Sequence, residues 1–66
     1  MLAIERRNAI LEKLRIEKRV VVSELSQIYD VSEETIRRDL EKLENDGFAT
    51  KSYGGAVLNE NTNLEF

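Results

Sequence analysis

The sequence predicts a mainly α-helical domain in which three helices precede a small antiparallel wing of two or three strands. Up to residue 46, apolar residues recur at intervals of three and four, the period of helices buried along one edge. After Gly47 the residues alternate in polarity, as they do in a half-buried strand. With 66 residues, the chain has room for one domain with a small core.

The first helix is expected over residues 3–16. Ile10, Leu11 and Leu14 form its apolar edge, and Ile4 extends that edge toward the N-terminus. The remaining side chains of this segment are mostly charged and form a solvated face. The spacing therefore predicts a structural helix that covers the core.

A short strand and a second helix are expected next. Val20–Val22 is a β-branched run that is too short for a helix and suits a small strand, which can add to the later hairpin. Ser23 is expected to cap a helix over residues 24–29. Leu25 and Ile28 are expected to face inward from that helix.

The third helix, over residues 33–46, carries the most informative pattern. Ser32 is a favourable N-cap, because its hydroxyl can accept a hydrogen bond from a first-turn N–H group. Gly47 is suited to the left-handed conformation that ends a helix. The stripe predicted to be buried consists of Ile36, Leu40 and Leu43.

Only Asp30 and Val31 separate the second helix from the cap of the third. So tight a turn commonly needs one residue at positive φ, and aspartate is among the few non-glycine residues that tolerate it. We therefore predict a left-handed conformation at Asp30. Helices joined this tightly cross steeply, which predicts a helix-turn-helix over residues 20–39 whose second helix projects from the surface to enter a DNA groove.

The wing is predicted over residues 48–58. Phe48–Tyr53 alternates as a strand does, Gly54 and Gly55 predict the turn, and residues 56–58 form the second strand. Residues 1–58 are thus expected to form the domain. The polar, asparagine-rich tail is interpreted as the start of a linker or as an artificial extension, and it covers residues 59–66.

Composition argues against several classes of function. The chain has no cysteine and no histidine, so thiol chemistry and the usual zinc ligands are absent, and no enzyme, cofactor or metal site is expected. No apolar run approaches the roughly 20 residues that span a bilayer, and the composition fits a cytoplasmic protein. The net charge is −3, so DNA binding requires the ten basic residues to gather on one surface.

The exposed edge of the third helix supplies the main candidate contacts. Arg38 is the first candidate for base contact, because arginine binds guanine O6 and N7 with about 1–3 kcal/mol of discrimination. Its alternative is an exposed pair with Glu34 one turn earlier. Arg37 is expected either to contact phosphate or to pair with Glu33. DNA binding needs both guanidinium groups free to meet a polyanion.

Other polar residues have subsidiary roles. Ser32 can cap the helix and contact phosphate together, Thr35 suits a phosphate or a thymine methyl group, and Glu34 can accept a hydrogen bond from cytosine. Asp39 is expected to anchor an arginine within the domain rather than to meet DNA. The predicted DNA-binding residues are Ser32, Glu34, Thr35, Arg37, Arg38, Lys42, Lys51, Ser52 and Tyr53.

Three groups of residues carry a resemblance to a known family. They are Arg6, Ile10 and Leu14, then Ser32-x-x-Thr35-Ile36-Arg37-Arg38-Asp39-Leu40, then Gly47-Phe48 with Tyr53-Gly54-Gly55-Ala56. In this order and spacing, nearly all of residues 3–58 resembles the N-terminal DNA-binding domain of the DeoR family of bacterial transcriptional regulators. In that family the wing often has arginine and histidine where this chain has Lys51 and Tyr53.

The resemblance implies a winged helix-turn-helix joined to a larger C-terminal domain that senses a sugar phosphate or related metabolite. It also implies a repressor of sugar or nucleoside catabolism genes. A second copy of the domain, in a homo-oligomer of the full-length protein, would add avidity for double-stranded DNA.

The alternative is a winged helix that binds another protein through the same polar face. The acidic balance suits that alternative, whereas the adjacent Arg37 and Arg38 and the family spacing favour DNA. Salt separates the two, because binding through phosphates weakens steeply as salt rises.

Overall fold

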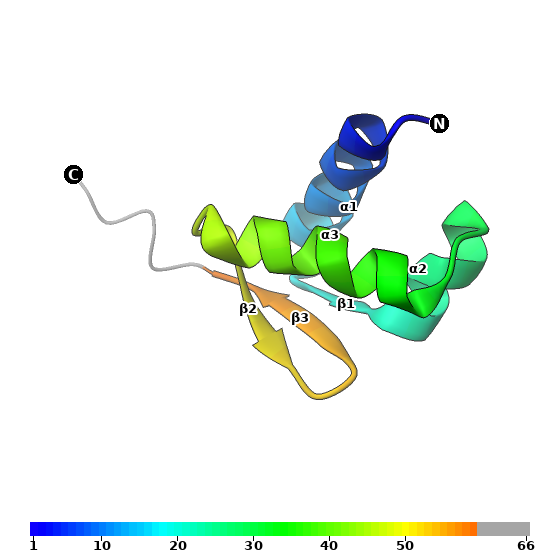
Figure 1. Cartoon of the computed structure of the whole chain (residues 1–66). Helices are drawn as coiled ribbons and strands as arrows, with labels where there is room; N and C mark the ends of the chain where they lie inside the picture. Colours follow the sequence, from blue (N-terminus) through cyan, green and yellow to red (C-terminus); the bar gives the residue numbers. More distant parts are fainter. Residues whose placement is uncertain (60–66) are drawn as a thin grey trace.

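The computed structural model describes residues 1–59, which contain three helices and one three-stranded sheet. The elements are α1 Ala3–Glu17, β1 Arg19–Val21, α2 Val22–Tyr29, α3 Glu33–Asn45, β2 Ala49–Ser52 and β3 Gly55–Leu58. In Figure 1, α3 passes in front of α1, and the β2–β3 hairpin extends below α3. This is the mainly helical fold with a small antiparallel sheet that the sequence predicts. None of these three helices is long and apolar enough to cross a membrane.

The core lies where the three helices meet the sheet. Its buried apolar residues are Ile10, Leu14, Val20, Val22, Leu25, Ile36, Leu40, Leu43, Ala49 and Ala56. The predicted stripe of α3 is therefore confirmed, and so is the part of the α1 edge formed by Ile10 and Leu14. Ile4 is exposed, so its predicted place on that edge is wrong. The first turn of α1 extends past the core.

The sheet has the order β1-β3-β2, and both neighbouring pairs are antiparallel. The predicted addition of a third strand to the hairpin is thus confirmed. The predicted turn at Gly54 and Gly55 is wrong by one residue, because Gly55 pairs with Ser52 and leaves Tyr53 and Gly54 as the turn. A Cβ atom on Gly55 would lie 1.9 Å from the carbonyl oxygen of Val20. The close approach of β1 to β3 therefore requires glycine within the strand.

The start of α2 differs from the prediction. The helix begins at Val22, and Ser23 is its second residue instead of its cap. The N-cap residue is Val21, which makes no side-chain cap hydrogen bond. The Val22 N–H instead donates to the carbonyl oxygen of Gly54 at 2.9 Å, so the wing supplies the acceptor that a cap would otherwise provide.

The inner edge of α2 also differs in one position. Leu25 is buried as predicted, but Ile28 is exposed. The residues of α2 that reach the core are Val22, Leu25 and Tyr29. Ile28 lies about 100° around the helix from Tyr29, and this rotation turns it toward solvent.

The turn between α2 and α3 is confirmed in detail. Asp30 has φ 57° and ψ 48°, the predicted left-handed conformation. The Val31 N–H donates to the carbonyl oxygen of Ser26 at 3.1 Å and closes the turn. At the other end of α3, Gly47 has φ 92°, so the predicted stop is confirmed too.

Candidate nucleic-acid interface

The first turn of α3 is fixed by Ser32. Its Oγ accepts a hydrogen bond from the Thr35 N–H at 3.1 Å, so the predicted N-cap is confirmed. The two hydroxyl oxygens of Ser32 and Thr35 lie 3.0 Å apart. Because the N-terminal end of a helix carries partial positive charge, these hydroxyls stand where a phosphate is favoured.

The two edges of α3 have opposite character. One edge is buried and holds Ile36, Asp39, Leu40 and Leu43. The charged side chains exposed on the other edge are Glu33, Glu34, Arg37, Arg38, Glu41 and Lys42. The helix is therefore held along one side and offers charged groups along the other, as the sequence predicts.

Both arginines of this edge are paired with a carboxylate one turn earlier. Arg37 Nη2 lies 3.1 Å from Glu33 Oε1, and Arg38 Nε lies 3.5 Å from Glu34 Oε2. The expectation that both guanidinium groups stay free is therefore wrong for the unbound domain. Helices favour such pairs, because residues four apart lie on neighbouring turns of one face.

These ion pairs are weak enough for another acceptor to replace the carboxylate. The side chains of Arg37 and Arg38 are 54% and 72% exposed. Exposed pairs at this spacing contribute only about 0.3–0.5 kcal/mol. A phosphate oxygen or a guanine edge can also bind the arginine fork in bidentate fashion, so it can take the place of the carboxylate.

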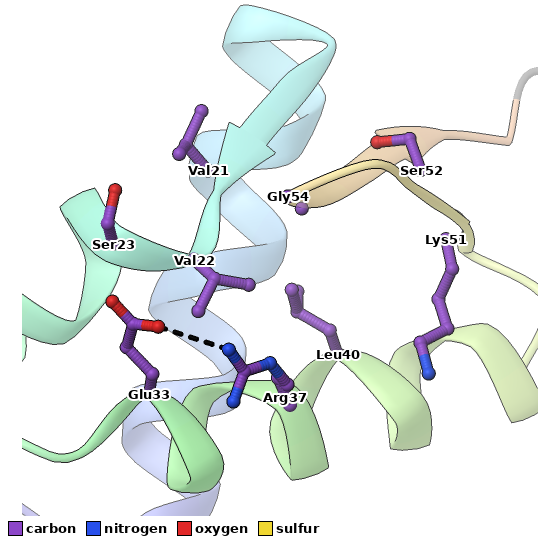
Figure 2. Close-up of a pocket in the computed structure, with 10 residues that line it drawn as sticks. Val21, Val22, Ser23, Glu33, Arg37, Leu40, Lys51, Ser52 and Gly54 are labelled. Atoms are coloured by element: carbon purple, nitrogen blue, oxygen red, sulfur yellow. Dashed lines mark hydrogen bonds and ion pairs between the residues drawn. The ribbon is translucent and has the colours of Figure 1, made fainter.

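An open cavity of about 250 Å³ lies where the start of α2, the exposed edge of α3 and the wing meet. It is lined by Val21, Val22, Ser23, Glu33, Arg37, Leu40, Lys51, Ser52, Gly54 and Gly55. Figure 2 shows Lys51 extending from the wing toward α3, while the Arg37 guanidinium is turned toward Glu33. Two cations, one from α3 and one from β2, thus border the same cavity.

The cavity brings together three of the nine predicted DNA-binding residues, namely Arg37, Lys51 and Ser52. The other six lie outside its lining, and they are Ser32, Glu34, Thr35, Arg38, Lys42 and Tyr53. Ser23 and Glu33 line the cavity without having been predicted as contacts. Their only signal in the sequence is a polar side chain in the first turn of a helix.

The wing carries its polar residues at the end of β2. Lys51, Ser52 and Tyr53 are all exposed, and Tyr53 stands fully exposed in the turn. The Lys51 N–H donates to Glu44 Oε2 at 3.4 Å, which links β2 to the last turn of α3. The role of Glu44 could not be predicted from the sequence, because a contact between a helix end and a strand leaves no local pattern.

The buried edge of α3 contains one charged residue that is anchored to α1. Asp39 is 2% exposed, and it accepts hydrogen bonds from Nε of Arg6 and, at 3.2 Å, from Nη2 of the same arginine. The predicted anchoring role of Asp39 is confirmed. The hydrogen bond with Asp39 raises the pKa of the Arg6 guanidinium, burial opposes that shift, and the attraction of the carboxylate adds to it.

The ion pair between Arg6 and Asp39 also contradicts the expected gathering of the basic residues on one surface. The Arg6 side chain is 13% exposed and held by Asp39, so Arg6 does not join a surface that faces DNA. The prediction that all ten basic residues gather on one surface is therefore wrong. The cations that border the cavity, Arg37 and Lys51, come from α3 and β2 instead.

A helix-turn-helix followed by a β-hairpin defines the winged helix-turn-helix class, in which the second helix of the pair enters the major groove of DNA. The sequence profile of the DeoR-like helix-turn-helix domain matches residues 6–62. The chain belongs to this family of DNA-binding domains.

Named relatives support the assignment. The chain is 53% identical over 57 residues to the uncharacterized HTH-type transcriptional regulator YulB of Bacillus subtilis (strain 168). These residues cover 86% of the chain and 22% of that protein. It is 47% identical over 58 residues to a putative aga operon transcriptional repressor of Escherichia coli O157:H7, covering 88% of the chain and 22% of the relative.

A third relative is named as an activator instead of a repressor. The L-fucose operon activator of Haemophilus influenzae (strain ATCC 51907 / DSM 11121 / KW20 / Rd) is 46% identical over 55 residues, covering 83% of the chain and 22% of that protein. The chain therefore spans about a fifth of the length of these three curated relatives. No solved structure matches it.

Proposed function

We propose that residues 1–58 bind double-stranded DNA at a preferred sequence, with α3 in the major groove. The observation that carries this proposal is that α3 exposes Arg38 opposite its buried stripe and Arg37 on the flank, in a chain of the DeoR-like family. The wing lies along the DNA backbone or in the adjacent minor groove. Phosphate contacts set the register of the domain, and base contacts select the sequence.

Arg38 is the proposed reader of guanine, and Glu34 is a proposed acceptor for a cytosine amino group. Arg37, Lys51 and Ser52 surround the cavity and are the proposed phosphate contacts on that side. The remaining proposed contacts are Ser32, Thr35, Lys42 and Tyr53. In the DNA complex, phosphate or base atoms replace the two carboxylates that pair with the arginines in the free domain.

The full-length protein is proposed to regulate genes of sugar or nucleoside utilisation in the bacterial cytoplasm, most simply as a repressor that blocks polymerase. Support comes from relatives named after the aga and L-fucose operons. A C-terminal region outside this chain would bind a sugar phosphate and join two or more copies. The isolated domain then binds weakly, because it lacks the avidity of a second copy.

Binding-site selection tests this function directly. The chain is incubated with a pool of random duplexes, and the enriched duplex is compared with a scrambled one by fluorescence anisotropy over a range of salt concentrations. We expect the selected duplex to bind at least tenfold more tightly and both affinities to fall steeply with salt. A chain that enriches no sequence is not a specific DNA-binding domain.

A protein-binding winged helix is the second candidate, favoured by the net charge of −3 and by the exposed Glu33 and Glu34. The same titration separates the candidates. A domain that reads DNA has a salt slope proportional to its number of phosphate contacts. Absence of duplex binding at low salt would favour a protein partner.

A further inference from the structure

Asp39 is the one buried charged side chain among the residues that the structure describes. It lies on the edge of α3 that also carries the apolar stripe, and its hydrogen-bond donor, Arg6, comes from α1, 33 residues away in the sequence. Arg6 holds both carboxylate oxygens, through Nε to Oδ2 and through Nη2 to Oδ1 at 3.2 Å. Arg7 adds a second cation, with Nη1 3.7 Å from Oδ1.

The remaining buried contacts of α3 are apolar. They are formed by Ile36, Leu40 and Leu43, which belong to the apolar core. Burial of apolar surface is itself non-directional, so these contacts oppose a roll of the helix only through the close packing of the core. A two-point hydrogen bond between a planar guanidinium and a carboxylate is directional, and it opposes such a roll.

The rotation of α3 decides where its exposed side chains point. Arg38 precedes Asp39 by one residue, so the two side chains are about 100° apart around the helix axis. A helix with its side chains has a radius of roughly 6 Å, so a roll of about 20° moves a side-chain tip by roughly 2 Å. Such a displacement exceeds the roughly 0.5 Å within which a binding constellation must be held.

Stability alone is a poor explanation for a charged pair at this place. Taking two charges out of water carries a desolvation penalty, and apolar residues of similar volume often replace a buried pair without loss of stability. We propose that Arg6 and Asp39 are positioning residues that set the rotation of α3, and through it the sequence discrimination of the DNA-binding edge. This inference rests on the proposed function.

The test replaces both members of the hydrogen-bonded pair, because removing only Arg6 or only Asp39 would leave the charge of the other in the interior. Arg7, whose side chain is 22% exposed, keeps its contact with solvent when Asp39 is removed. The variant Arg6→Met/Asp39→Leu keeps the net charge and fills the space with apolar atoms. We expect it to fold cooperatively with a thermal midpoint at or above that of the parent chain. Its affinity ratio between the selected and the scrambled duplex should fall at least tenfold, while the salt slope stays the same.

The matched control is Lys13→Met/Glu17→Leu. Lys13 Nζ and Glu17 Oε2 lie 3.0 Å apart as an ion pair on the surface of α1, so this variant makes the same kind of change away from α3. Its affinity ratio should equal that of the parent. A loss of discrimination in the control as well would overturn the positioning role, because the effect would then belong to ion pairs in general.

The outcomes separate this inference from the proposed function. A parent chain that distinguishes no duplex overturns the proposed function, and the inference falls with it. If the parent discriminates and the folded Arg6→Met/Asp39→Leu variant discriminates equally, only the positioning role is overturned.

A conservative variant decides the case in which the double variant does not fold. Arg6→Lys keeps the charge but loses the planar fork. We expect it to fold and to lose several-fold in the affinity ratio at an unchanged salt slope. An Arg6→Lys chain that discriminates as well as the parent would overturn the inference.

Discussion

The N–H of Val22 donates a hydrogen bond to the carbonyl oxygen of Gly54 at 2.9 Å, and this contact joins the first residue of α2 to the turn of the wing. The helix-turn-helix and the wing are therefore built against each other at the edge of the candidate interface. The next residue of the wing, Gly55, continues the contact, since its backbone lies against the backbone of Val20 and Val21.

We expect Gly55→Ala to destabilise the domain by at least about 2 kcal/mol, because the added methyl group forces β1 and β3 apart. The clash is severe, since the new Cβ atom would lie 1.9 Å from the carbonyl oxygen of Val20. Thermal unfolding followed by circular dichroism measures the effect. Val57→Ala, on the exposed side of the same strand, is the control and should lower the free energy of unfolding much less. A Gly55→Ala chain that melts with the parent contradicts the close pairing of β1 with β3.

The turn between α2 and α3 gives a second prediction. Asp30 has φ 57°, a conformation that costs most L-residues about 1–2 kcal/mol. Asp30→Ala should therefore lower the free energy of unfolding by about 1 kcal/mol, whereas Asp30→Gly should stay close to the parent. Urea titration of both variants measures the difference. Equal loss in the two variants would show that the aspartate side chain matters more than the backbone conformation.

The two arginines of α3 should behave differently in DNA binding. Arg38→Ala should lower affinity for the selected duplex by about 1–3 kcal/mol and blur the sequence preference. Arg37→Ala should weaken all duplexes alike and reduce the salt slope by about one unit. Anisotropy titrations on selected and scrambled duplexes separate these effects. If both variants bind as tightly as the parent, the assigned roles are wrong.

Removal of the carboxylate that pairs with Arg37 should raise DNA affinity, whereas removal of either arginine should lower it. Glu33 holds Arg37 at 3.1 Å beside the cavity, so Glu33→Gln frees the guanidinium and removes a negative charge near phosphate. We expect affinity for any duplex to rise about two- to fivefold. Glu17→Gln makes the same change of net charge on α1 and should raise affinity less. Equal gains in the two variants would mean that only net charge matters.

DNA affinity should be nearly independent of pH between about 6 and about 9, because the chain has no histidine, the side chain that ordinarily titrates there. The hydrogen bonds that Arg6 donates to Asp39 and that Lys13 donates to Glu17 raise the pKa of Arg6 and of Lys13. Stability from a raised pKa is present at lower pH and is lost only as pH rises through the raised value. Anisotropy at constant ionic strength measures the profile, and a sharp step within this range would contradict it.

Most of α3 and its flanks could be predicted because the signals are local. The Ser32 cap, the left-handed Asp30 and the stop at Gly47 each depend on residues within a few positions. The buried stripe follows from helical spacing alone. Asp39 could be assigned an arginine partner because a carboxylate beside that stripe needs compensation.

The misplaced turn and the misplaced helix cap come from contacts between distant segments. The sequence offers two adjacent glycines for the turn, and only the approach of Val20 shows that Gly55 belongs to the strand. Ser23 looks like a cap, but the acceptor for the start of α2 comes from Gly54 of the wing. The cavity likewise joins residues of α2, α3 and β2, so its lining could not be read from any one segment.

The order of the sheet has a consequence for synthesis of the protein. β3 is the last strand in the chain but lies between β1 and β2, so neither of the other two has its partner until residue 58 has been made. On the ribosome, the helices can therefore form while the wing still lacks its central strand. The sheet is therefore complete only after its central strand has been added between the other two.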